Sequence, residues 1–135
     1  MSAPRGVLDT SVVIALPAIN DPGQLPDEPC VTAVTIAELS VGPLVARSDV
    51  ERANRQAVLQ QAMSDFEPLP FDAAAAAAFG RVAAALRASG RKRRARAFDA
   101  LIAATALSQG LPVFTASPDD FDGIPDLEVV AVATA

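Results

Sequence analysis

The chain has no histidine, tryptophan or tyrosine, and its only cysteine is Cys30. A disulfide within the chain is therefore impossible, and zinc sites of Cys and His, Ser-His-Asp triads and Cys-His pairs are excluded. Any catalysis has to use carboxylates, hydroxyl groups, arginines or the single lysine, Lys92. Base stacking would fall to six phenylalanines, which argues against a stacking platform for nucleic acid.

Long apolar runs and targeting segments are also missing. No stretch approaches the roughly 20 apolar residues that span a bilayer, and residues 1–5 lack the apolar segment of a secretory signal. We therefore expect no membrane association and a cytoplasmic location. The length of 135 residues, 51% of them hydrophobic, fits one folded domain over residues 1–135.

Apolar and β-branched runs alternate with helical patterns along the chain. Strands are expected near residues 6–8, 30–34, 112–115 and 127–132, with a short extended piece at 67–70. Helices are expected at 11–15, from 35 past the proline at 43, and at 49–63, 73–89 and 97–107. This alternation predicts an α/β/α sandwich around a mainly parallel sheet of four or five strands.

Asp9 follows the first apolar strand and precedes two good helix N-cap residues, Thr10 and Ser11. It is thus expected at the carboxyl end of a central strand, the edge at which open α/β sheets bind ligands. A carboxylate beside core strands needs a cation or hydrogen-bond donors. The alternative, that Asp9 only caps the next helix, fits this stretch equally well.

Four further acids occupy informative positions: Glu38, Asp99, Asp119 and Asp120. Glu38 lies three residues after Thr35, the spacing of a capping box, and Asp99 lies in the most apolar helix. The remaining two follow the strand at 112–115, where a simple acidic loop is the alternative. Because parallel strands end at one edge, we expect these acids to converge with Asp9. Clustered carboxylates repel unless a cation neutralises them, and oxygen ligands suit Mg²⁺ or Mn²⁺, as one or two ions.

Four segments resemble, in order and spacing, the signature blocks of PIN-domain proteins: Leu8–Ser11, Thr35–Leu39, Phe98–Ala104 and Asp120–Phe121. The short length and the I-A-E-L and D-x-x-I-A-A forms are most similar to VapC-type toxins of bacterial toxin–antitoxin pairs. The resemblance covers residues 6–132. It implies a metal-dependent endoribonuclease that cleaves RNA with metal-activated water held by clustered carboxylates.

By the same resemblance, each motif residue has an expected role. The catalytic and metal-binding acids would be Asp9, Glu38, Asp99 and Asp120, with Asp119 as a competing metal ligand. The supporting hydroxyls would be Thr10, Ser11, Thr115 and Ser117, the last standing where many members carry Asn or Asp. RNA phosphates would contact the basic hexapeptide through Arg91, Lys92, Arg93, Arg94 and Arg96, which hold five of the chain's eleven positive charges. A solvated loop is the alternative for any single arginine.

The resemblance also implies partners: a cognate VapB-type antitoxin, whose tail would lie in a groove between the early helices, and a second copy in a homodimer. Leu39, Val41, Val45 and the helix from residue 49 are candidate partner surfaces, with core packing as the alternative.

The main alternative to an endoribonuclease is a PIN fold that binds RNA or a partner without cutting. Two further alternatives are a phosphatase and a receiver domain. A haloacid-dehalogenase-like phosphatase needs an aspartate where Ser11 stands, and a receiver domain needs a lysine after the last strand.

Overall fold

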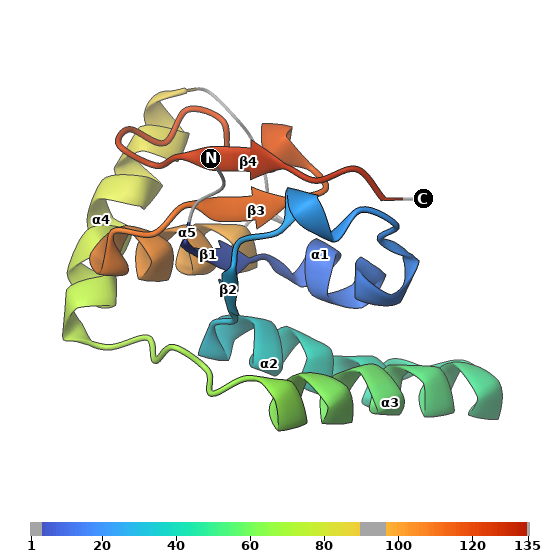
Figure 1. The fold of residues 1–135 in the computed structure, drawn as a ribbon. Coiled ribbons are helices and arrows are strands. Elements are labelled where there is room, and N and C mark those ends of the chain that lie inside the picture. Colours follow the sequence, from blue (N-terminus) through green and yellow to red (C-terminus); the bar gives the residue numbers. More distant parts are fainter. Residues whose placement is uncertain (1–3, 90–96, 135) are drawn as a thin grey trace.

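The structure is a computed structural model that describes residues 4–89 and 97–134 (Figure 1). The strands are β1 (Arg5–Leu8), β2 (Glu28–Cys30), β3 (Val113–Thr115) and β4 (Val129–Ala131). The α-helices are α1 (Thr10–Ala15), α2 (Ala33–Val41), α3 (Asp49–Asp65), α4 (Ala73–Ala88) and α5 (Ala97–Gln109). Short 3₁₀ turns occupy Leu16–Ala18, Pro22–Gln24, Gly42–Val45 and Pro118–Phe121. The basic hexapeptide 91–96 lies outside the described residues.

The sheet has four strands in the order β2-β1-β3-β4, and every neighbouring pair is parallel. Val7 pairs with both Cys30 and Val113, so β1 is an inner strand. The predicted parallel sheet is confirmed. Because all four strands run the same way, the residues that follow β1 and β3 come out at the same edge of the sheet.

Alternate residues of the inner strands enter two separate cores, as the period of two in a strand requires. Val7 and Val113 pack with the helices α4 and α5 on one face. Leu8 and Phe114 pack on the other face with α1, α2 and α3. The result is the predicted three-layer sandwich, with α4 and α5 on one side and α2 and α3 on the other (Figure 1).

The ring of Phe114 packs against Gly6 of β1. A Cβ built on Gly6 would overlap Cε1 of Phe114, so no larger residue fits without displacing that ring. Phe114 is itself 2% exposed and belongs to the core on the α1 side. Gly6 therefore leaves the space that this core ring occupies.

The helix α5 is the buried layer that its composition predicts. Ala100 and the run from Ile102 to Ala106 are buried, and α5 packs against α4. None of the helices in residues 4–89 and 97–134 has the length and hydropathy to cross a membrane.

The second strand and helix begin and end earlier than predicted. The strand ends at Cys30, and α2 starts at Ala33 because the hydroxyl of Thr32 caps it by accepting from the amide of Thr35 at 3.2 Å. Thr32 also forms a parallel bridge to Leu69, within the short extended piece predicted at 67–70. The proposed capping box of Thr35 and Glu38 is therefore wrong.

Two other local expectations need correction. The residue that caps α1 is Asp9 itself, not Thr10 or Ser11. The helix α2 stops at Val41, and Pro43 lies in the following 3₁₀ turn rather than within the helix. Asp72 caps α4, accepting from the amide of Ala75 at 3.0 Å.

Candidate active site

Asp9 lies directly after β1 and is 4% exposed. Its Oδ1 accepts hydrogen bonds from the Ser11 hydroxyl at 2.6 Å and from the Val12 amide at 3.1 Å. Its Oδ2 accepts one from the Thr115 hydroxyl, also at 2.6 Å. Asp9 thus combines both of its predicted roles, since it caps α1 and is a buried carboxylate at the carboxyl edge of the sheet.

The hydroxyls that hold Asp9 are themselves held by the backbone that follows β3. The amide of Ala116 donates to Ser11 Oγ at 3.2 Å, and the amide of Ser117 donates to Thr115 Oγ1 at 2.9 Å. Each hydroxyl accepts from an amide and donates to Asp9, so both hydroxyl protons are directed at the carboxylate. Ser11 and Thr115 thus contact Asp9 through their hydroxyls, while Ser117 contributes its amide.

Glu38 lies in the second turn of α2 and is joined to the start of α1 by a hydroxyl. Thr10 donates to Glu38 Oε1 at 2.6 Å, and its oxygen lies 3.0 Å from the hydroxyl oxygen of Thr35. Thr10 is the residue next to Asp9. The contact predicted between Thr10 and an acid of the site is therefore made with Glu38.

The pKa of Glu38 reports its surroundings. Burial raises this pKa above its ordinary value of 4.5, and the charge of Asp9 raises it further, while the hydrogen bond from Thr10 acts in the opposite direction. Asp9 and Glu38 therefore lie close enough to repel each other. A cation between them would relieve this repulsion.

Hydrogen bonding leaves one oxygen of each acid more available than the other. Oδ1 of Asp9 already accepts two bonds, whereas Oδ2 accepts one and keeps a lone pair. Oε1 of Glu38 accepts from Thr10, while Oε2 accepts no hydrogen bond from any described residue. Oδ2 of Asp9 and Oε2 of Glu38 are thus the atoms best suited to bind a cation.

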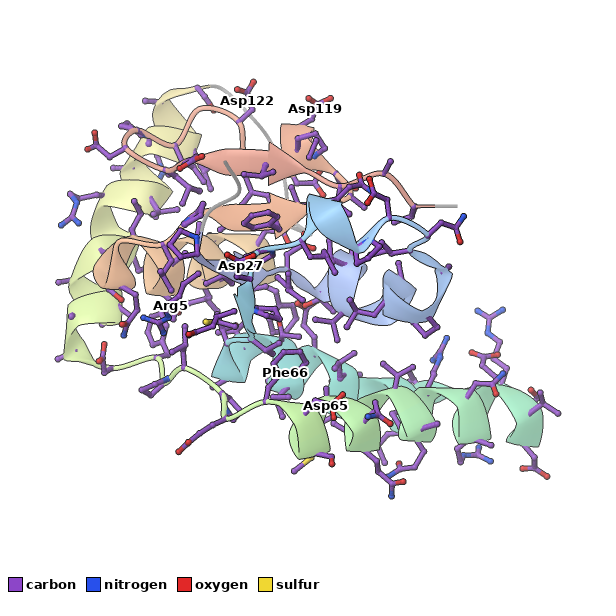
Figure 2. The ribbon with its side chains drawn as sticks, viewed as in Figure 1. Arg5, Asp27, Asp65, Phe66, Asp119 and Asp122 are labelled. Carbon is purple, nitrogen blue, oxygen red and sulfur yellow. The ribbon has the colours of Figure 1, made fainter. Side chains whose placement is uncertain are left out.

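The other predicted acids lie at the start of α5 and in the 3₁₀ turn after β3. Asp99 lies in the first turn of α5, a helix that contacts α2, and its side chain is partly buried. Asp119 is exposed and points outward beside β4, on the side of the molecule opposite Asp65 (Figure 2), whereas Asp120 is partly buried. Within residues 4–89 and 97–134, no three acidic side chains form a group that would hold one ion. The participation of Asp99, Asp119 and Asp120 therefore stays a prediction.

Beside Glu38 opens a cavity of about 490 Å³. Its apolar wall comes from Ile14, Leu39 and Val58, and Arg55 brings a positive charge. Arg55 is held by Glu51, four residues earlier on α3, and by the carbonyl of Gly42 at 2.9 Å. The cavity therefore lies between α1, α2 and α3, in the place where the sequence predicted a groove.

The sequence did not single out two of the residues that complete this region. Thr35 has capping-box spacing from Glu38, and this spacing does not indicate its contact with Thr10. The i,i+4 spacing of Arg55 from Glu51 indicates an ion pair but not a position beside Glu38.

The chain was compared with known families and structures. A model of the PIN domain family matches residues 6–127. Ribonuclease VapC5 of Mycobacterium tuberculosis is 44% identical over 132 residues, covering 94% of this chain and 95% of the relative. Ribonuclease VapC4 of the same organism is 37% identical over 134 residues, covering 98% of this chain and all of the relative (100%).

A solved structure gives the same result. The crystal structure of VapBC-5, a member of the VapBC family of toxin–antitoxin systems from Mycobacterium tuberculosis, matches with a TM-score of 0.81 and 43% identity. The match covers 96% of this chain and 99% of that chain. The chain therefore belongs to the PIN domain family, in its VapC group.

Proposed function

We propose that the chain is the toxin of a type II toxin–antitoxin pair and an endoribonuclease. The observation that carries the proposal is that the buried Asp9 follows β1 directly and that its neighbour Thr10 hydrogen-bonds to Glu38 of α2, which brings both acids to the carboxyl edge of the sheet. Relatives named ribonucleases, at 44% and 37% identity over nearly the whole chain, support RNA as the substrate class. Such an enzyme would act in the cytoplasm.

The two carboxylates fit a divalent cation of the Mg²⁺ or Mn²⁺ kind. Mg²⁺ is commonly held by one or two carboxylates, with water and substrate phosphate completing its shell, so two acids suffice for a first site. When bound, such an ion makes a water molecule more acidic and stabilises charge at phosphorus. Whether one or two ions bind depends on whether Asp99 and Asp120 also contribute.

The chain's own residues would have distinct tasks in this reaction. Asp9 and Glu38 would hold the cation, since each keeps acceptor capacity on one carboxylate oxygen. Ser11 and Thr115 direct their protons at Asp9 and so fix its orientation without neutralising it. Asp99 and Asp120, the less exposed of the two acids after β3, would add further oxygen ligands.

Outside the described residues, Arg91, Lys92, Arg93, Arg94 and Arg96 would hold RNA phosphates. Because they precede Asp99 directly in the chain, they would act beside the scissile bond.

The cavity beside Glu38 suits a segment of the cognate VapB-type antitoxin. Its apolar wall of Ile14, Leu39 and Val58 would take apolar side chains, and Glu38 would take a cationic one. The solved VapBC-5 relative is itself a toxin–antitoxin system.

We also propose a homodimer, for which the exposed side chains of Val41 (48%) and Val45 (61%) are available.

The decisive variant is Asp9→Asn. Asparagine is an equally good N-cap, so α1 should form, but the charge that attracts the cation is lost. We expect cleavage of total RNA in Mg²⁺ to fall by at least about 100-fold, because loss of a partner that only orients a ligand already costs about 10- to 100-fold and Asp9 would itself be a ligand. The matched control is Asp72→Asn, since Asp72 is also a helix N-cap but is exposed, and it should cut like the parent.

EDTA and metal restoration complete the test. Cleavage should stop with EDTA and return with excess Mg²⁺ or Mn²⁺. Parental cleavage by Asp9→Asn would refute the site, and undiminished cleavage in EDTA would refute the role of the cation. Binding of RNA without any cleavage by the parent would favour the non-cutting alternative.

A further inference from the structure

We propose that Thr35 is a positioning residue, which directs Glu38 toward the cation through Thr10. The inference rests on the proposed function and extends it to a residue that does not touch the cation. Thr35 is fully buried in the first turn of α2, one turn before Glu38. Its hydroxyl oxygen lies 3.0 Å from that of Thr10, which donates to Glu38 Oε1 at 2.6 Å.

The direction of this chain of hydrogen bonds follows from counting protons. A hydroxyl has one proton, and Thr10 uses its proton on the ionised carboxylate of Glu38. Thr10 is therefore the acceptor in its contact with Thr35, and Thr35 is the donor. The order is Thr35 to Thr10 to Glu38, with every proton pointing toward the acid.

A second buried helical threonine shows that this arrangement is not the usual one. Thr105 in α5 is also fully buried, and its hydroxyl donates to the carbonyl of Leu101 in its own helix at 2.9 Å. Such local bonds are the common use of a threonine within a helix. Among the described residues, Thr35 makes no bond of this kind, and its hydroxyl reaches another element instead.

The hydrogen bonds from Thr35 to Thr10 to Glu38 determine which oxygen of Glu38 remains free to bind the cation. Thr10 follows Asp9 at the start of α1, and Thr35 belongs to α2, so the relay ties these helices together on the side of Oε1. Holding Oε1 in place fixes the carboxylate plane and leaves Oε2 for the cation. Without the donation from Thr35, the Thr10 hydroxyl is free to turn, and Glu38 loses its fixed orientation.

The test is Mn²⁺ binding by the purified full chain, measured from the electron paramagnetic resonance of free Mn²⁺. Thr35→Val keeps the shape and removes the hydroxyl, and Thr35→Ser keeps the hydroxyl. We expect Thr35→Val to weaken binding by about 10-fold, the lower range for loss of an outer hydrogen-bond partner. Thr35→Ser should restore most of the affinity, and the matched control Thr105→Val should bind like the parent.

A double-mutant cycle separates positioning from packing. If Thr35 acts through Thr10, the double variant Thr10→Val/Thr35→Val binds Mn²⁺ no more weakly than Thr10→Val alone. Additive losses, or parental binding by Thr35→Val, would overturn the inference while leaving the metal site intact. Absence of Mn²⁺ binding by the folded parent would overturn the proposed metal site and the inference together.

Discussion

Hydrogen-bond donors are divided unevenly between Asp9 and Glu38. Three donors from Ser11, Val12 and Thr115 reach Asp9, whereas Glu38 receives one, from Thr10. Burial raises the pKa of Glu38 and the charge of Asp9 raises it further, while the single bond from Thr10 lowers it. Ionisation of Glu38 is therefore unfavourable in the folded chain.

This imbalance predicts that Glu38→Gln stabilises the metal-free protein. Because the pKa of Glu38 is higher in the folded chain than in the unfolded one, the folded chain binds more protons in the interval between the two values. Stability therefore falls as the pH rises through that interval. At pH 7 we expect Glu38→Gln to raise the Tm, because glutamine keeps the shape and can still accept from Thr10 but carries no charge.

The comparison of two pH values makes this prediction specific. Well below pH 4.5, the ordinary pKa of glutamate, Glu38 of the parent is protonated in both the folded and the unfolded chain. The parent and Glu38→Gln then both carry a neutral side chain, and the difference in Tm should vanish. The control is Glu51→Gln on α3, which loses an ion pair with Arg55 and should be slightly less stable than the parent. A Tm for Glu38→Gln at or below that of the parent at pH 7 would mean that Glu38 is not destabilised by its surroundings.

At the scale of elements, the segment after β3 is fastened to the end of β1. Ala116 and Ser117 donate their amides to the hydroxyls of Ser11 and Thr115, which in turn donate to Asp9. Thr115 is fully buried, so the loss of its hydroxyl cannot be compensated by solvent. The same bonds that orient Asp9 therefore hold two strand ends together.

Thr115→Val should accordingly destabilise the fold as well as the site. The variant keeps the shape, removes the bond to Asp9, and leaves the Ser117 amide without its acceptor. We expect a loss of about 1 to 3 kcal/mol in the free energy of unfolding by urea, the cost of leaving a buried polar group unsatisfied. Thr115→Ser should lose less because it keeps the hydroxyl. Equal stability of Thr115→Val and the parent would show that this connection is not needed to hold the strands.

The types of the elements were predictable from the sequence, but some of their ends were not. Alternating apolar runs and helical patterns predicted a mainly parallel sheet of four or five strands and five helices, and the described residues form four parallel strands and five α-helices. The run Val31–Thr35 is rich in β-branched residues, which favour a strand, although α2 begins within it. Thr32 caps α2 locally, and its bridge to Leu69 depends on residues that only folding brings together.

At the scale of the whole molecule, the parallel sheet brings distant residues to one edge. Asp9 and Thr115 are 106 positions apart in the sequence and share a hydrogen bond, and Glu38 of α2 accepts one from Thr10, the residue after Asp9. Parallel topology made a shared edge predictable. The directions in which Asp99, Asp119 and Asp120 point depend on helix rotation and loop shape, which the residue pattern does not specify.

The most direct test of the central claim, that Asp9 and Glu38 share a divalent cation, is anomalous scattering from a crystal of the protein soaked in Mn²⁺. We expect a strong peak within bonding distance of carboxylate oxygens of both Asp9 and Glu38, because small divalent cations bind carboxylate oxygens directly. A peak bound elsewhere, or none at saturating Mn²⁺ with both side chains ordered, would contradict it.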